Sequence, residues 1–236
     1  MIIKAKSIKI GIVFIFFGLF AGILIKQIAV PKNEEAFSGL SDIVVVCDAG
    51  HGEPDGGAVG ISGTLEKDIN LDITKKVAET LENRGIKVIM TRTADNGIYD
   101  GDAQTIRQKK LSDMHKRLDI VNSSGADLFI SIHMNSFSDS NVRGVHVFYN
   151  KEDENLKNAA NMIKERIAEI TGAKSHEIKS TSDSLYLMQK SSVPAILVEC
   201  GFLSNPEEEE KLTDEKYRSK MAWAIADAII SFAKRS

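Results

Sequence analysis

Short apolar runs alternate with amphipathic stretches along most of this chain. The apolar runs predict five strands, at residues 43–47, 86–90, 128–132, 145–149 and 195–198. Between the first two runs, Ile69, Ile73 and Val77 recur every four residues, which is the spacing of a buried helix face. Further helices are expected near 113–123, 152–170 and 214–233. Strands that alternate with helices predict a single α/β domain with a mostly parallel central sheet flanked by helices.

One longer apolar run, from Ile10 to Ile25, follows three lysines near the start of the chain. This pattern is typical of a secretory signal or a short membrane anchor, and we expect an uncleaved anchor over residues 1–30. A polar stretch at 31–42 predicts a linker to a domain at 43–236. The lysines should stay in the cytoplasm. The domain is therefore expected to be extracytoplasmic, secreted or held to the membrane through this segment only.

Composition and charge narrow the classes of partner. With 43% hydrophobic and 27% charged residues, the body is typical of a globular protein. A net charge of -3 provides no broad basic surface, which excludes nucleic acid as a partner. The densest basic run, Arg107–Lys110 with Lys116 and Arg117, is interpreted as a solvated face without function. Cys47 and Cys200 are expected to be buried thiols on neighbouring core strands, with a disulfide or a metal thiolate as the alternatives.

Residues that can bind a metal stand at the ends of the predicted strands. His51 follows the first strand in the glycine-rich loop DAGHGEPDGGAVG (48–60), and His133 follows the third. Glu66 lies in the first turn of a helix, where the helix dipole stabilises a carboxylate, and Thr64 is the expected N-cap. The carboxyl ends of parallel strands share one edge of a sheet. Two histidines and one glutamate with an open fourth position form a common catalytic zinc arrangement.

A second glutamate, Glu199, follows the last predicted strand, which is otherwise apolar. An acid at a buried edge needs a partner, and beside a metal it would serve as the base. The residues alone leave open that these four positions are scattered core residues, because they are distant in sequence. The glycine-rich loop could also bind phosphate, but it has neither GxGxxG nor a P-loop lysine and it is acidic.

The remaining polar candidates have lesser expected roles. Surface or packing roles are expected for three histidines: His115, His146 and His176. Three further residues could orient metal ligands from behind: Asp48, Asp55 and Asn135.

From Val44 to about Phe232, the chain resembles the zinc-dependent N-acetylmuramoyl-L-alanine amidases. That family carries a DPGHGG loop, a helix-opening Glu, SIHAN and VExGFxSN in this order, and the chain has DAGHGE, Glu66, SIHMN and VECGFLSN. The resemblance implies one Zn2+ held by His51, Glu66 and His133, with Glu199 as the catalytic glutamate. Three positions depart from the family pattern, none of them at a ligand position, and they could alter substrate fit or zinc affinity: Ala49, Glu53 and Met134.

Within this family, the PDGGAVG loop, the compact body and the N-terminal segment resemble the spore-cortex germination amidases. The resemblance implies hydrolysis of the amide between N-acetylmuramic acid and L-alanine in peptidoglycan. It also implies that muramic-δ-lactam is then formed by a separate deacetylase, with a role at the spore cortex in germination. The alternatives are a vegetative wall amidase, a zinc peptidase of related fold and a non-catalytic peptidoglycan-binding module.

The stretch between His133 and Glu199 leaves little room for the occluding helix that some family members insert there. Self-inhibition by such a helix is therefore not expected. A hydrolase of the cell wall needs some other control, and we expect either restricted timing or an activating protein partner that completes the site.

Overall fold

The computed structural model describes residues 40–181 and 185–235, and these form a single α/β domain. Six strands make one sheet in the order β2-β1-β3-β6-β4-β5. The strands are β1 (Val44–Ala49), β2 (Lys87–Met90), β3 (Leu128–Asn135), β4 (His146–Tyr149), β5 (Lys179–Ser180) and β6 (Ala195–Phe202). Every neighbouring pair is parallel except β4 and β6. The predicted mostly parallel sheet is confirmed.

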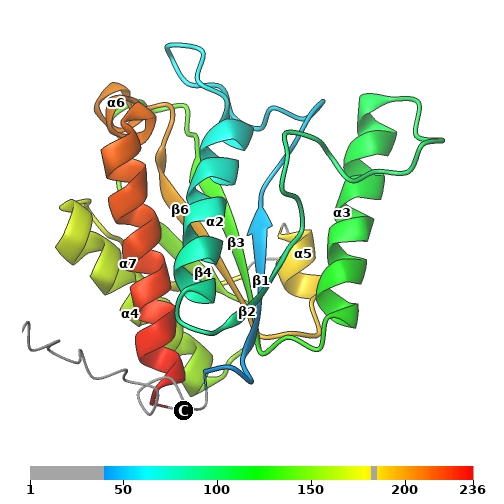
Figure 1. Cartoon of the computed structure of the whole chain (residues 1–236). Helices are drawn as coiled ribbons and strands as arrows, with labels where there is room; N and C mark the ends of the chain where they lie inside the picture. The colour runs from blue at the N-terminus through cyan, green and yellow to red at the C-terminus, as the bar shows by residue number, and fades with distance from the viewer. Residues whose placement is uncertain (1–39, 182–184, 236) are drawn as a thin grey trace, which may run out of the picture. The chain divides into compact units, whose positions relative to one another are not determined.

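Helices lie on both faces of this sheet. They are α2 (Glu66–Glu82), α3 (Ile106–Ser123), α4 (Glu154–Thr171), α5 (Tyr186–Lys190), α6 (Pro206–Thr213) and α7 (Glu215–Ala233). Helix α7 lies between α2 and α4 on one face of the sheet, and α3 and α5 lie on the other (Figure 1). We refer to these two sides as the α2/α4/α7 face and the α3/α5 face.

Alternate residues of the central strands point to opposite faces. On the α2/α4/α7 face the strands are apolar along their whole length, and they belong to the larger core cluster: Val45, Cys47, Ile130, Ile132, Ile196 and Val198. The cluster on the α3/α5 face is smaller and includes Val46, Phe129 and Leu197. Two residues further along each strand, this second face carries a polar side chain: Asp48, Ser131 and Glu199. The α3/α5 face therefore turns from apolar to polar toward the carboxyl ends of the strands.

Helix α3 begins at Ile106, seven residues before its predicted start. The reason is a capping box at Thr105, whose hydroxyl accepts a hydrogen bond from the Gln108 backbone N–H at 3.2 Å. The Gln108 side chain accepts in turn from the Thr105 backbone N–H at 2.9 Å. Both hydrogen bonds satisfy donors that a helix start leaves without partners.

Other local predictions also differ from the structure. The N-cap of α2 is Leu65 and not Thr64, and it makes no side-chain capping bond. Helix α6 was not predicted, although Asn205 caps it by accepting from the Glu208 backbone N–H at 3.1 Å. Strands β3 and β6 run beyond their predicted ends, so the two polar residues predicted to follow them lie within the strands.

Both cysteines are buried free thiols, as predicted. Cys47 lies on β1 and Cys200 on β6, and β3 separates these strands, so the prediction of neighbouring strands is wrong. Burial raises the pKa of both thiols well above its ordinary value. Each thiol therefore packs as a small apolar side chain.

The predicted anchor at 1–30 and nearly all of the predicted linker at 31–42 lie outside the described residues. Among the residues that the structure does describe, no helix combines the length and the apolar character needed to span a bilayer. The assignment of residues 43–236 as one functional domain stays a prediction.

Candidate functional site

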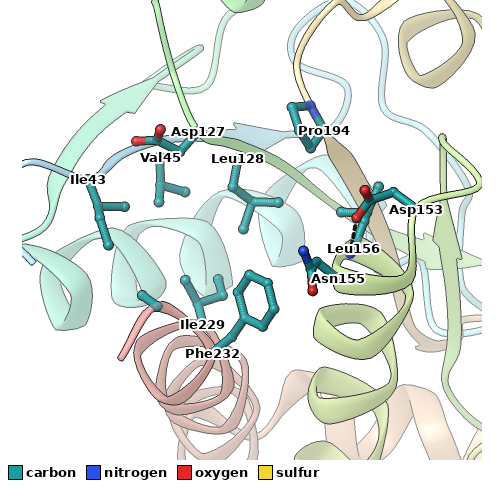
Figure 2. Close-up of a pocket in the computed structure, with 11 residues that line it drawn as sticks. Ile43, Val45, Asp127, Leu128, Asp153, Asn155, Leu156, Pro194, Ile229 and Phe232 are labelled. Atoms are coloured by element: carbon teal, nitrogen blue, oxygen red, sulfur yellow. Dashed lines mark hydrogen bonds between the residues drawn. The ribbon is translucent and has the colours of Figure 1, made fainter. Parts of the chain in front are cut away.

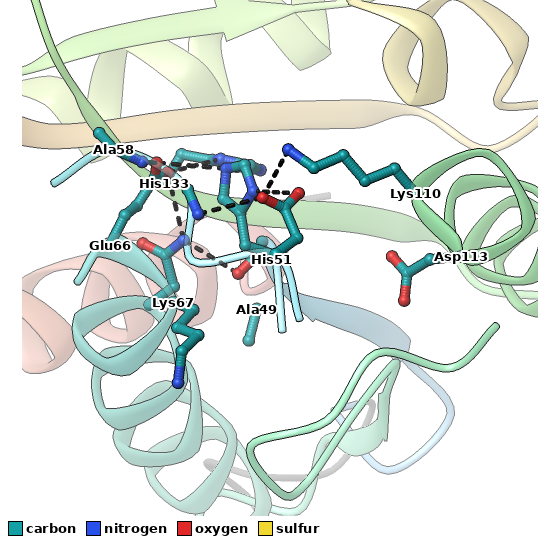
Figure 3. A network of polar contacts seen from close by, with 12 residues as sticks. Ala49, His51, Ala58, Glu66, Lys67, Lys110, Asp113 and His133 are labelled. Atoms are coloured by element: carbon teal, nitrogen blue, oxygen red, sulfur yellow. Dashed lines mark hydrogen bonds and ion pairs between the residues drawn. The ribbon is translucent and has the colours of Figure 1, made fainter. Parts of the chain in front are cut away.

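Three predicted site residues meet at the carboxyl edge of the sheet (Figure 3). His51 follows β1, Glu66 is the first residue of α2, and His133 lies near the end of β3. The Glu66 carboxylate stands between the imidazoles, with Oε2 3.2 Å from His51 Nε2 and Oε1 3.0 Å from His133 Nδ1. One ligand atom from each residue lies within 4.8 Å of the other two. The predicted convergence of these three side chains is therefore present.

Glu66 is held by backbone and side-chain donors. Oε2 accepts from the Ala58 backbone N–H at 2.7 Å, and Oε1 accepts from the Met134 backbone N–H at 3.1 Å. Burial alone would raise the pKa of Glu66, but hydrogen bonds and charge from His133 and His51 hold it well below its usual range. Glu66 is consequently an ionised carboxylate with a fixed orientation, which suits a metal ligand.

His51 has a backbone that few residues other than glycine adopt, with φ at 62°. Its Nδ1 lies 2.9 Å from Asp55 Oδ2, which leaves Nε2 to face Glu66. Burial lowers the pKa of His51, but the hydrogen bonds to Asp55 and Glu66 outweigh it and raise the pKa to about 9. A metal cation would take the place of this proton, because a histidine ligand must be deprotonated at the atom that binds.

Asp55 orients His51, as the sequence predicted. Its other oxygen, Oδ1, lies 2.7 Å from Lys110 Nζ and accepts from the Gly57 backbone N–H at 3.2 Å. Figure 3 shows this chain running from Lys110 on α3 through the carboxylate to the imidazole. A carboxylate on the far nitrogen of a ligating histidine fixes the ring and its tautomer. Lys110 was interpreted as part of a solvated face, so its contact with the site is a correction.

Arg117 is the larger correction, because it is almost fully buried and was interpreted as solvated. Its guanidinium lies 2.5 Å from Asp48 Oδ1 and donates to the backbone oxygens of Ala49 at 2.7 Å and His51 at 2.6 Å. Burial opposes its charge, but Asp48 and Asp113 raise the pKa of Arg117 above its ordinary value. Arg117 thus links the loop that carries His51 to the buried end of β1 through hydrogen bonds.

Two residues predicted to orient ligands do not contact them. Asp48 accepts from Arg117 and from the hydroxyls of Thr91 and Ser131, both at 2.6 Å. Asn135 accepts from the Ser136 backbone N–H at 2.8 Å. Asp48 therefore holds Arg117, Thr91 and Ser131 together below the site, and Asn135 stabilises the turn after β3.

Two glycines leave space for the side chains of His51, Glu66 and His133, which we call the triad. A Cβ at position 50 would lie 2.2 Å from the His133 ring, so any side chain at Gly50 would displace the imidazole. A Cβ at position 57 would lie 2.5 Å from Glu66 Oε2, and Gly57 has a φ of 71°. Gly50 is therefore required by close approach, and Gly57 by both close approach and backbone conformation.

Glu199 lies beside the triad, in register with His133 on the adjacent strand. Its Oε2 is buried and has no hydrogen-bond partner among the described residues. Burial raises the pKa of Glu199 to about 7, although the charge of His133 opposes the rise. A carboxyl group with this pKa can take up and release a proton near neutral pH.

The residues present fit a catalytic zinc ion. Two imidazoles and one carboxylate are a donor set of catalytic zinc sites, and their atoms already converge around one point. The orphaned oxygen of Glu199 supplies an acid-base group next to them. The arrangement can therefore hold a metal and move a proton in the same small volume.

A separate hollow of about 300 Å³ opens at the opposite edge of the sheet (Figure 2). Its lining is largely apolar and includes Ile43, Val45, Leu128, Ile229 and Phe232. Two of its polar side chains already have partners, since Asp127 accepts from the Val44 N–H at 2.9 Å and Asp153 from the Leu156 N–H at 2.8 Å. The chemistry therefore belongs to the carboxyl edge.

Comparison with known proteins agrees with this geometry. The family described as N-acetylmuramoyl-L-alanine amidase matches residues 45–231. The germination-specific N-acetylmuramoyl-L-alanine amidase of Bacillus subtilis is 38% identical over 196 residues, which cover 82% of this chain and 81% of the relative. The amidase LytC of Bacillus subtilis is 32% identical over 80% of this chain and 35% of its own length. The CwlD amidase of Clostridioides difficile, solved in complex with the GerS lipoprotein, has a TM-score of 0.79 and 38% identity, with coverage of 83% of this chain and 100% of that one.

Proposed function

The chain belongs to the N-acetylmuramoyl-L-alanine amidase family, and on this premise we propose that it cleaves the muramic acid to L-alanine amide of peptidoglycan with one Zn2+. His51, Glu66 and His133 are the proposed metal ligands. Glu199 is the proposed catalytic acid-base. The observation that carries the proposal is the convergence of the three ligand atoms within 4.8 Å, beside a carboxylate that has an unpartnered buried oxygen.

Glu199 moves the proton in this scheme. When bound, zinc supplies a Lewis acid that polarises the carbonyl and lowers the pKa of a water molecule. Glu199 takes a proton from the attacking water as the new carbon–oxygen bond forms. The carbon–nitrogen bond then breaks, and Glu199 returns the proton to the departing alanine nitrogen. Its buried Oε2 has no partner among the described residues, so this atom is free to accept and return the proton.

The test is the release of new alanine amino termini from purified peptidoglycan, with zinc and with a chelator. Glu199→Gln should retain zinc and lose about 10²- to 10⁴-fold in turnover, the usual contribution of general acid-base catalysis. His133→Ala should lose the metal. Glu210→Gln, on the exposed surface of α6, is the matched control and should behave like the wild type. Full activity in Glu199→Gln would refute its assignment.

The products also separate the alternative functions. A zinc peptidase of related fold would release amino termini other than alanine from the same substrate. A non-catalytic binding module would bind peptidoglycan and release nothing. The intact four-residue set argues against the non-catalytic binding module, and only the identity of the released amino termini separates the amidase from the peptidase.

We further propose that this amidase acts in the spore cortex, ahead of muramic-δ-lactam formation. Similarity to the germination-specific amidase supports this setting. Spores from a strain that lacks the gene should be depleted of muramic-δ-lactam and should regain it on complementation. Normal lactam with altered vegetative walls would instead favour a wall amidase, a reading supported by the similarity to LytC.

An activating protein partner is also proposed, because the similar CwlD was solved as a complex with a lipoprotein. Both proposals place the domain outside the cytoplasm, secreted or tethered by the N-terminal segment. Adding a candidate lipoprotein should raise the rate or the zinc affinity. Equal rates with and without every candidate would remove the partner from the proposal.

A further inference from the structure

His146 is aligned across the sheet with two residues of the proposed site, Glu199 and His133, and it has no part in the mechanism proposed above. It opens β4 and pairs directly with Glu199 on β6, which in turn pairs with His133 on β3. Paired residues on neighbouring strands project from the same face of the sheet. Strands lie about 4.8 Å apart, so the row from β3 to β4 spans about 10 Å.

The His146 ring has an unmet hydrogen-bonding requirement. Its Nε2 is buried and has no partner among the described residues. The ring lies against Phe202 and Phe148, with centroid separations of 5.5 and 6.2 Å. Burial, followed by the charges of His176, Lys179 and Lys174, lowers the pKa of His146 to about 4. The imidazole is therefore neutral at physiological pH and has one N–H to donate.

Basic side chains surround His146 on the side away from the metal ligands. The loop before β5 is fastened to β4, because the Val145 N–H donates to the Lys174 backbone oxygen at 2.7 Å. The rings of His176 and His146 lie 4.2 Å apart between centroids. Lys179 pairs with Phe148 across β4 and β5, which places it on the same face of the sheet as His146.

The positive charges of Lys174 and Lys179, beside His146, are available to a ligand. Lys174 and Lys179 are both exposed, and within the described ranges neither forms an ion pair. The acid between them, Glu177, lines another groove together with Lys157 and Lys164 of α4. A neutral N–H donor with two free ammonium groups beside it is suited to a carboxylate.

We propose that His146, Lys174 and Lys179 form a subsite that binds a free carboxylate of the stem peptide, which rests on the proposed amidase function. A peptide residue spans at most about 3.6 Å, so a row of about 10 Å corresponds to about three extended residues, and the carboxylate must lie within this distance of the bond that is cut. The γ-linked acidic residue that follows alanine in stem peptides carries a carboxylate in this interval. In the other direction along the sheet, Arg117 and Lys110 of α3 contact the loop at residues 48–60 that carries His51.

The decisive comparison uses two muramyl tripeptides that differ only at the second stem residue, one with a free carboxylate and one with its amide. The wild type should hydrolyse the free acid about tenfold more efficiently, mainly through KM, which corresponds to one charge-assisted hydrogen bond. Lys179→Gln and His146→Gln should remove most of this preference, because they should lower the efficiency on the free acid more than the efficiency on the amide. Lys220→Gln, exposed on α7, is the control and should keep the preference.

Binding of the two released tripeptides, measured by titration calorimetry, tests the subsite without turnover. The free acid should bind the wild type more tightly than the amide, and Lys179→Gln should abolish the difference. Equal binding of both peptides, or an equal loss for both in the variants, would overturn the subsite. Peptide discrimination in a protein that cleaves neither substrate would instead contradict the amidase function and leave the subsite standing.

Discussion

The two faces of the sheet are built from the same strands and differ in what they contain. On the α2/α4/α7 face, β1, β3 and β6 present apolar side chains from end to end, under three helices. On the α3/α5 face, the same strands change from Val46, Phe129 and Leu197 to Asp48, Ser131 and Glu199. The first face supplies buried apolar area, and the second carries polar side chains at the carboxyl ends of its strands.

This difference shows how a single strand serves stability and function together. Because side chains alternate with a period of two, a strand can keep one face apolar while the other changes character. The apolar face holds the backbone in register, and register places His133 beside Glu199. Substitutions on the two faces should therefore have separable effects, except where a buried residue links them.

Arg117→Met should have the largest effect. It should lower both the stability of the fold and the affinity for zinc, so for this residue the two effects are not separable. Removing the guanidinium leaves Asp48 buried without its counter-charge, which costs about 3–5 kcal/mol of unfolding free energy. The variant should also bind zinc more weakly, because Arg117 holds the His51 carbonyl at 2.6 Å. Chemical denaturation and zinc titration measure the two losses. Arg107→Met, exposed on the same helix, should show neither, and a stable Arg117→Met would contradict the assigned role.

Ile73→Ala, on the apolar face, should lower the stability of the fold without changing the affinity for zinc. Ile73 is fully buried on α2 against the α2/α4/α7 face of the sheet, and truncation of such a side chain costs about 2–5 kcal/mol. Zinc affinity should stay within about twofold of the wild type at temperatures where the variant is folded. Ile106→Ala, 60% exposed, provides the control for stability. A tenfold weaker metal affinity in Ile73→Ala would show that the faces are coupled.

Asp55→Asn, at the polar end of the sheet, should lower the affinity for zinc and leave the stability of the fold nearly unchanged. The amide keeps the size of the carboxylate but no longer fixes the His51 ring by charge, and zinc affinity should fall about 10- to 100-fold. The melting temperature of the metal-free protein should change little, and Asp119→Asn on the exposed side of α3 is the control. Competition with a chromophoric chelator measures the affinity. An unchanged zinc affinity would remove Asp55 from the site.

In addition to its loss of turnover, Glu199→Gln should change the pH dependence of the stability of the metal-free protein. The folded pKa of about 7 exceeds the ordinary 4.5, so the metal-free wild type loses stability as pH rises between these values. Glutamine has no such loss. The variant should therefore gain about 2–3 kcal/mol over the wild type between pH 5 and pH 8. Thermal melts in the presence of a chelator measure it, and a constant difference across this range would exclude the raised pKa.

Much of this fold could be read from apolar periodicity, and the site from four motifs. The first strand, the helix containing Ile73 and the positions of His51 and Glu66 all depend on local pattern. The order of the strands does not, because β6 enters between β3 and β4 through contacts distant in sequence. The antiparallel direction of β4 was not predicted for the same reason.

The errors about single residues have physical causes. Arg117 lies in a basic helix and looks solvated until the buried carboxylate of Asp48 is placed opposite it. The start of α3 was missed although Thr105 and Gln108 have the spacing of a capping box. His146 alternates with valines and looks like a packing residue, and only its register with Glu199 connects it to the site.

The position of β6 has a consequence for the order in which the protein becomes active during synthesis. The three proposed metal ligands all lie within the first 133 residues, whereas Glu199 arrives with the last strand. Until that strand emerges, β3 and β4 lack the neighbour that joins them. A nascent chain therefore contains all three proposed metal ligands long before it contains the proposed acid-base group. With this topology the proposed site stays incomplete until Glu199 is synthesised, so hydrolysis is expected only when synthesis is nearly complete.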